Sequence, residues 1–203
     1  MNTGPEQFVP HSIDLSALVR RSVASLYSHL VTRPMGQALR MGIESQIAEL
    51  GEFCVSVLDF TQVIVLDYSC ADEAVAKLVL RYQRDDRPSN AWFLARGVSE
   101  QHREPIEEVL SRHNLALAAE VEDEGFTLLG AATEEERDAW HVLQQEGTLT
   151  SAQAAQLLGS GESHAASILE SLAARRTVFR ANSPLRYIAL ATLLTRPGGR
   201  SRD

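Results

Sequence analysis

The chain has 203 residues, of which 44% are hydrophobic and 23% are charged, and its formal net charge is −8. This length is enough for one large or two small globular domains. No apolar run approaches the ~20 residues of a membrane-spanning helix, residues 1–10 lack the features of a secretory signal, and two cysteines are too few for a disulfide framework. We therefore expect a cytoplasmic protein that does not enter a membrane.

The charge is unevenly distributed along the chain. Residues 1–132 carry 11 basic and 19 acidic side chains, whereas residues 133–203 carry eight of each. Attraction to phosphate requires basic residues, so the acidic part is a poor candidate for binding nucleic acid. The neutral C-terminal part is not excluded by its charge.

Residues 1–27 are expected to form a loose tail and then a helix, capped by Asp14, with Val23 and Leu26 on its apolar face. Strands and helices then alternate, as hydrophobic periodicity and capping residues indicate. The expected strands are 27–31, 53–60, 91–95, 115–121 and 126–129, and the expected helices are 32–50, 70–82 and 100–113. This alternation predicts an α/β domain with a mixed sheet over residues 28–131.

The most informative segment is the turn from Asp67 to Glu73, where an apolar strand ends and a helix begins at about Cys70. Ser69 is the predicted N-cap, because Ser69 and Asp72 have the S-x-x-D spacing of a capping box. Asp72 and Glu73 are then expected at the surface of the first turn, where unpaired backbone N–H groups meet solvent. Such a place can bind an anion, carry a switchable group or dock a partner. A well-capped helix without further function is the alternative.

Residues 28–130 resemble the STAS domain of bacterial anti-sigma factor antagonists, and more closely the STAS-like domains of unknown function in bacterial regulators. The resemblance rests on 30–34, on 58–60 with Val63, and on 67–73. In the antagonists this helix begins with Asp-Ser-Ser/Thr-Gly, and phosphorylation of the first serine by an anti-sigma kinase breaks the complex. Here Tyr68 holds the phosphorylated position and Cys70 replaces the glycine. The resemblance implies a partner-docking surface with lost or altered phosphorylation, made of Asp67, Tyr68, Ser69, Cys70, Asp72 and Glu73.

Cys70 also suggests an enzymatic alternative, because a helix N-terminus lowers a thiol pKa. Its acidic neighbours act in the opposite direction, and no histidine lies close in sequence. The six histidines show none of the spacings typical of metal sites. We therefore expect no enzymatic activity, no cofactor and no metal.

A second unit is predicted over residues 133–195. Thr133 with Glu136 and Thr150 with Gln153 form two capping boxes, Gly147 ends the first helix, and a third helix begins after the turn at 159–161. Segments 177–180 and 185–190 indicate a hairpin. Three helices followed by a hairpin resemble a winged helix-turn-helix, and residues 196–203 are expected to be a disordered tail.

In a DNA-binding winged helix the third helix enters the major groove. Its outward positions would include Ser163, His164 and Ser167, with Arg175 and Arg176 at its end to hold phosphate and Arg180 and Arg186 on the wing. The first turns lack the Arg, Asn or Gln side chains that read bases well. Contact with protein, or dimerisation, is the alternative use of this unit.

These observations predict a bacterial regulatory protein in which a STAS-like module of the partner-switch type is joined to a winged-helix output domain. Its partner would be a regulatory protein, such as an ATPase of the anti-sigma kinase kind. The alternative is a DNA-binding transcriptional regulator whose STAS-like domain senses a ligand or forms a homodimer.

Overall fold

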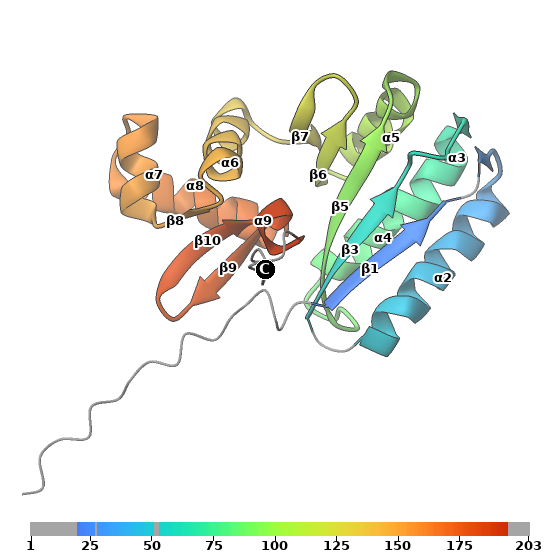
Figure 1. Ribbon diagram of the computed structural model, residues 1–203, viewed down its shortest axis with the longest axis horizontal. Helices are drawn as coiled ribbons and strands as arrows, with labels where there is room; N and C mark the ends of the chain where they lie inside the picture. Colours follow the sequence, from blue (N-terminus) through green and yellow to red (C-terminus); the bar gives the residue numbers. More distant parts are fainter. Residues whose placement is uncertain (1–19, 27, 51–52, 195–203) are drawn as a thin grey trace, which may run out of the picture.

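The computed structural model describes residues 20–26, 28–50 and 53–194 of the chain. Its centre is a five-stranded sheet in the order β1-β3-β5-β6-β7 (Figure 1). The first four strands run parallel and β7 pairs antiparallel with β6. The sheet strands are β1 (Arg20–Ser25), β3 (Phe53–Asp59), β5 (Asn90–Val98), β6 (Ala116–Val121) and β7 (Gly125–Gly130). The predicted α/β class with a mixed sheet is therefore confirmed.

Helical segments cover one face of this sheet. They are α2 (Arg33–Leu50), the continuous run α3 (Tyr68–Ala71), η1 (Asp72–Ala76) and α4 (Lys77–Gln83), and α5 (Glu100–Arg112). Alternate strand residues point toward them, as the pleat requires. Leu58, Phe93 and Leu117 pack in one core with Ile47 and Ile106. A separate two-stranded parallel sheet, β2 (His29–Leu30) with β4 (Val65–Leu66), leads into α3.

The C-terminal segment covers part of the other face (Figure 1). It contains α6 (Glu134–Glu146), β8 (Thr148–Leu149), α7 (Ser151–Leu158), α8 (Glu162–Ala174), β9 (Val178–Asn182), β10 (Leu185–Ala189) and α9 (Leu190–Leu194). Its core is shared with the sheet: Trp92 and Leu94 from β5 pack in one cluster with Trp140 and Phe179. The two predicted units are thus joined by a common hydrophobic core, and the boundary between 131 and 133 remains a prediction.

Local signals predicted the C-terminal segment well. Both capping boxes form, and Gly147 ends α6 with a φ of 75°. The third helix and the hairpin also lie where they were expected. The sequence did not predict β8 or α9. Strand β8 completes a three-stranded sheet of order β8-β10-β9.

The predicted N-terminal helix is wrong where it can be compared, because residues 20–25 form strand β1. Val23 pairs with Val57 in a parallel ladder, an interaction between segments far apart in sequence that local periodicity does not reveal. Asp14 and the tails 1–19 and 196–203 lie outside the described residues.

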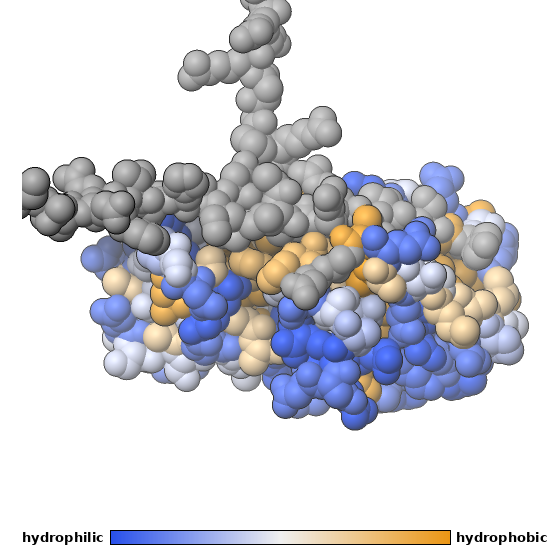
Figure 2. Space-filling view, turned by 90° about the horizontal axis from the view of Figure 1, so that it is seen from below, coloured by the Kyte–Doolittle hydropathy of each residue, from blue (hydrophilic) through white to orange (hydrophobic). Residues whose placement is uncertain are grey.

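Among the described residues, no helix combines the length and apolar character needed to cross a bilayer. The face shown in Figure 2 is mixed: hydrophilic residues dominate its lower edge, and apolar residues gather near the middle, beside the residues drawn in grey.

Candidate functional site

The candidate site begins at Asp67, which the strands place at the start of a helix. The Asp67 backbone N–H donates to the Leu30 carbonyl over 2.9 Å, which continues the β2–β4 pairing. The Asp67 carboxylate accepts hydrogen bonds from the Cys70 backbone N–H at 2.9 Å and from the Ser69 hydroxyl at 2.7 Å. Asp67 is therefore the N-cap, and the prediction that Ser69 caps this helix is wrong. The helix begins at Tyr68, two residues earlier than predicted.

Hydrogen bonding keeps the Asp67 carboxylate charged. The bond from the Ser69 hydroxyl is the main cause that lowers the pKa of Asp67, helped by the backbone N–H groups and by Arg33, and it outweighs the opposing effect of burial. The Ser69 hydroxyl, which is half-buried, is occupied by this contact. The polar groups of this turn thus bond to one another: the Asp67 carboxylate accepts from both the Ser69 hydroxyl and the Cys70 backbone N–H.

Gly36 allows α2 to lie directly against α3, and the sequence analysis missed it. A Cβ atom at Gly36 would lie 2.6 Å from the Cys70 carbonyl oxygen and 2.9 Å from the Glu73 Cβ. No side chain larger than hydrogen fits in that space. The close approach brings basic side chains of α2 within reach of the next turn.

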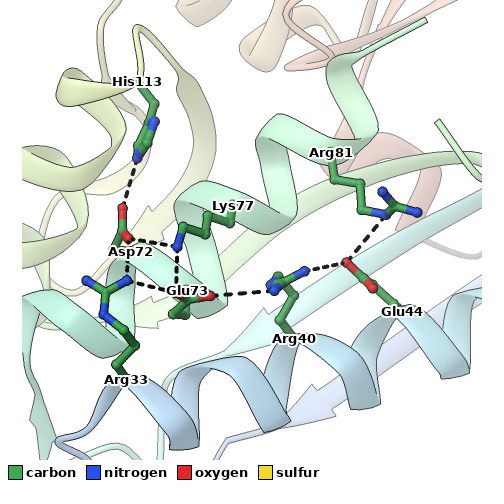
Figure 3. A network of polar contacts seen from close by, with 8 residues as sticks. All are labelled: Arg33, Arg40, Glu44, Asp72, Glu73, Lys77, Arg81 and His113. Carbon is green, nitrogen blue, oxygen red and sulfur yellow. Dashed lines mark hydrogen bonds and ion pairs between the residues drawn. The ribbon is translucent and has the colours of Figure 1, made fainter. Parts of the chain in front are cut away.

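Asp72 and Glu73 occupy the centre of an ion-pair network rather than an open acidic edge (Figure 3). Asp72 contacts His113 at 2.8 Å and Arg33 at 3.2 Å. Glu73 contacts Lys77 at 2.5 Å, Arg33 at 2.8 Å and Arg40 at 3.5 Å. Arg40 and Arg81 both reach Glu44, which extends the network along α2 and α4.

Burial and charge compete at both carboxylates. Burial alone would raise the pKa of Glu73, but the bonds from Lys77 and Arg33 outweigh it and lower that pKa. At Asp72 the bond from His113 and the charge of Lys77 likewise outweigh burial and lower the pKa. Glu73 is only 6% exposed. The expectation that it lies at the surface is wrong, because it faces α2 and not solvent.

The network sits on a wide helical turn. Residues 72–76 form a π-helical segment, closed by a bond from the Lys77 backbone N–H to the Asp72 carbonyl five residues earlier. Such segments are rare, and they are often found at functional sites. The sequence pattern gave no indication of this turn.

Cys70 and Tyr68 lie on opposite sides of the helix start. Cys70 is fully buried, and burial together with Asp67 raises its pKa to about 11. The thiolate needed for nucleophilic or redox chemistry is therefore disfavoured at neutral pH. Tyr68 is 43% exposed, and its hydroxyl donates to Glu104 on α5 at 2.9 Å.

Four exposed apolar or aromatic side chains surround this helix start: Val31, Ile64, Val65 and Tyr68, which we call the docking patch. Strands β2 and β4 pair side by side, and Val31, directly after β2, therefore lies on the segment next to Val65. Ile64 is 61% exposed. The sequence does not distinguish these exposed residues from buried ones, because their sequence neighbours Leu30 and Leu66 are equally apolar and lie in the core.

The predicted phosphate contacts Arg175 and Arg176 lie between the C-terminal segment and the sheet. Arg175 donates to the Ala131 carbonyl at 2.6 Å and contacts Glu136 at 3.3 Å. The Arg176 guanidinium lies 4.1 Å from the centre of the Trp92 ring, and its Nε donates to the Ala91 carbonyl at 2.8 Å. Both side chains are engaged within the protein.

The other predicted nucleic-acid residues lie on the outer surface of the C-terminal segment. Ser163, His164, Ser167, Arg180 and Arg186 are all exposed. His164 lies 3.4 Å from Glu135, and Arg180 pairs with Glu170 at 2.8 Å. The exposed face of α8 thus has acidic side chains beside its candidate contacts, which works against attraction to phosphate.

Within residues 20–26, 28–50 and 53–194, no group of three His, Cys, Asp or Glu side chains is arranged to hold a metal ion. No protein-family model matches the chain, and no curated protein matches its sequence.

Proposed function

We propose that this protein is a non-enzymatic regulator that binds a partner protein at the docking patch and at the adjoining turn from Asp67 to Ser69. In this proposal residues 28–131 are a STAS-like interaction module and residues 133–195 are a winged-helix output unit. The partner is a regulatory protein, and an ATPase of the anti-sigma kinase kind is the class that the resemblance implies.

The observation that carries the proposal is the exposure of Val31, Ile64, Val65 and Tyr68 around one helix start. A group of exposed apolar side chains rimmed by polar ones is typical of a protein-binding surface. Here the rim includes Glu104, which accepts the Tyr68 hydrogen bond. Tyr68 is also the kind of residue that often contributes strongly to binding energy.

The state of Cys70 supports a non-enzymatic role. Its sulfur is buried, and burial together with the negative charge of Asp67 raises its pKa to about 11. Asp72 and Glu73 are held by cationic side chains, so they contribute to the site by fixing α2 against η1 rather than by direct contact with a partner.

DNA binding by the C-terminal segment is the second candidate function. It is favoured by the exposure of Ser163, His164 and Ser167 on one helix and of Arg186 on the hairpin. It is opposed by Glu135 and Glu170, which pair with His164 and Arg180. A gel-shift titration of the full chain at low and high salt distinguishes the two, because phosphate contacts make affinity fall steeply with salt. No salt-sensitive binding at micromolar protein excludes the DNA function.

The docking proposal is tested by Ile64→Asp, with Leu157→Asp as the matched control. Both residues are exposed leucine-sized side chains, at 61% and 53%, and Leu157 lies on α7 of the other unit. Binding of a purified ATPase of the anti-sigma kinase kind, the partner class that the resemblance implies, is measured by calorimetry for each variant. We expect Ile64→Asp to abolish binding and Leu157→Asp to retain it. Equal affinities of the two variants would contradict the proposal.

A further inference from the structure

A cavity of about 390 Å³ lies between the sheet and the C-terminal segment. Its floor is formed by strand residues, and α6 and α9 contribute to the opposite wall. Its lining includes Val57, Leu94, Glu120, Phe126, Gln144 and Leu194. This volume is within the range of small-molecule sites, which often lie between structural units.

The cavity lies toward the carboxyl ends of three parallel strands. Each of these strands contributes a lining residue from its last three positions: Val57 from β3, Arg96 from β5 and Glu120 from β6. In α/β proteins ligands bind preferentially at this end of the strands. None of the lining residues belongs to the docking patch, which surrounds the start of α3.

The cavity contains a carboxylate that has no partner among the described residues. The Glu120 side chain forms no hydrogen bond or ion pair with the residues that the structure describes, although it lines the cavity and is half-buried. Arg96, on the neighbouring strand, donates instead to Asp59 at 2.7 Å. Because Arg96 is paired with Asp59, Glu120 is the charged side chain of the lining that no described residue neutralises.

An aromatic ring lies directly beside this carboxylate. Glu120 on β6 and Phe126 on β7 are register partners in the antiparallel ladder. Directly opposed residues place their Cβ atoms about 4.5–5.5 Å apart on the same face of a sheet. A carboxylate next to an aromatic face is suited to an organic cation, which gains from both the charge and the ring.

We infer that this cavity binds a small molecule with an apolar body and a cationic ammonium group. The ammonium group pairs with the Glu120 carboxylate and contacts the Phe126 ring. The apolar body packs on Val57 and Leu94. Since Gln144 and Leu194 belong to the C-terminal segment, the bound molecule touches both units and stabilises their contact.

The test uses three probes of nearly equal size and different charge: 4-phenylbutylammonium, 4-phenylbutanol and 4-phenylbutyrate. Each is titrated into the full chain by calorimetry at one ionic strength. We expect saturable binding of the ammonium probe. The alcohol should bind about ten-fold more weakly, because a hydrogen bond to a charged group is worth about this factor in affinity. The carboxylate probe should not bind. Equal binding of the ammonium and carboxylate probes would overturn the inference, as would no binding of any probe.

Two variants locate the binding. Glu120→Gln is expected to remove the preference for ammonium over alcohol, whereas Glu122→Gln, an exposed glutamate outside the cavity lining, should keep it. Ala191→Phe should fill the cavity and abolish binding of the ammonium probe. Retained ammonium preference in Glu120→Gln would contradict the assignment. If Ala191→Phe fails to fold, as circular dichroism would show, the two glutamate variants decide the question.

Discussion

Arg176 is expected to stabilise the contact between the C-terminal segment and the sheet, and Arg176→Ala tests this. The variant loses a charged hydrogen bond to the Ala91 carbonyl, worth about 1.5–3 kcal/mol. It also loses the guanidinium contact with the Trp92 ring, worth about 1–2 kcal/mol where water is excluded. Both lost contacts join Arg176, in the C-terminal segment, to strand β5 of the sheet.

Burial of the Arg176 charge opposes these gains. Burial, together with the nearby Arg87, lowers the pKa of Arg176 to about 10. A lowering of this size corresponds to about 3 kcal/mol of unfavourable free energy for the charged form. The two losses together are worth about 2.5–5 kcal/mol, so after subtraction of this cost Arg176→Ala is predicted to lower the free energy of unfolding by about 1 kcal/mol, and by no more than about 2 kcal/mol. Arg176→Met should lose less, because its apolar chain still packs on Trp92 and no charge is buried.

Urea denaturation of the full chain provides the assay, with Arg186→Ala as the control. Arg186 is exposed, so its truncation should change stability by no more than about 0.5 kcal/mol. Tryptophan fluorescence reports on both units together, since Trp92 lies in the sheet and Trp140 in α6. Coincident fluorescence and circular dichroism transitions are expected for a shared core. Equal stability of Arg176→Ala and Arg186→Ala, or two separate transitions, would refute the reasoning.

Three further predictions concern the helix start and the core beneath it. Gly36→Ala should destabilise the protein by roughly 1–3 kcal/mol, because the added Cβ would lie 2.6 Å from the Cys70 carbonyl oxygen. Gly42→Ala is the control: a Cβ there meets nothing within 4 Å, so it should stabilise α2 by about 0.5–1 kcal/mol. Similar shifts of the two variants in thermal unfolding would contradict this prediction. Cys54 and Cys70 are buried and should resist Ellman's reagent at pH 8 until the chain unfolds, so rapid labelling of the native protein would be evidence against the structure. The pKa of Cys70 is about 11 in the folded protein and near 9 in the unfolded chain, so the unfolded thiol loses its proton first as the pH rises. The stabilisation that the buried thiol provides should therefore be lost between pH 9 and 11. In Cys70→Ser the free energy of unfolding should fall less over this pH range.

The sequence predicted those parts of the fold that depend on short-range chemistry. The boxes at Thr133 and Thr150 and the glycine at 147 each act through contacts within four residues, and each was confirmed. The strand at 20–25 was predicted as a helix because its partner, β3, lies more than thirty residues away. At the start of α3 the local S-x-x-D spacing predicted Ser69 as the cap, but the pairing of β4 with β2 places Asp67 there instead.

The site was less predictable, because its chemistry depends on side chains brought together by tertiary packing. Asp72 and Glu73 suggested an acidic surface, but Arg33 and Arg40 from α2 and His113 from the end of α5 meet them. Nor does a basic residue at the end of a helix reveal which way it faces. Arg175 and Arg176 were expected to face phosphate, yet they lie against the sheet and its loops.

A partner bound at the docking patch requires a physical connection to α8 if it is to influence the C-terminal segment. The helical run from Tyr68 to Gln83 supplies a continuous one. Its first residue is part of the docking patch, and at its last residue the Gln83 side-chain amide donates to the Arg175 carbonyl, at the end of α8, over 2.7 Å. A movement of this helix would therefore change a direct contact with α8. Two units joined only by a flexible linker would lack such a connection, whereas here the sheet and the C-terminal segment also share a hydrophobic core.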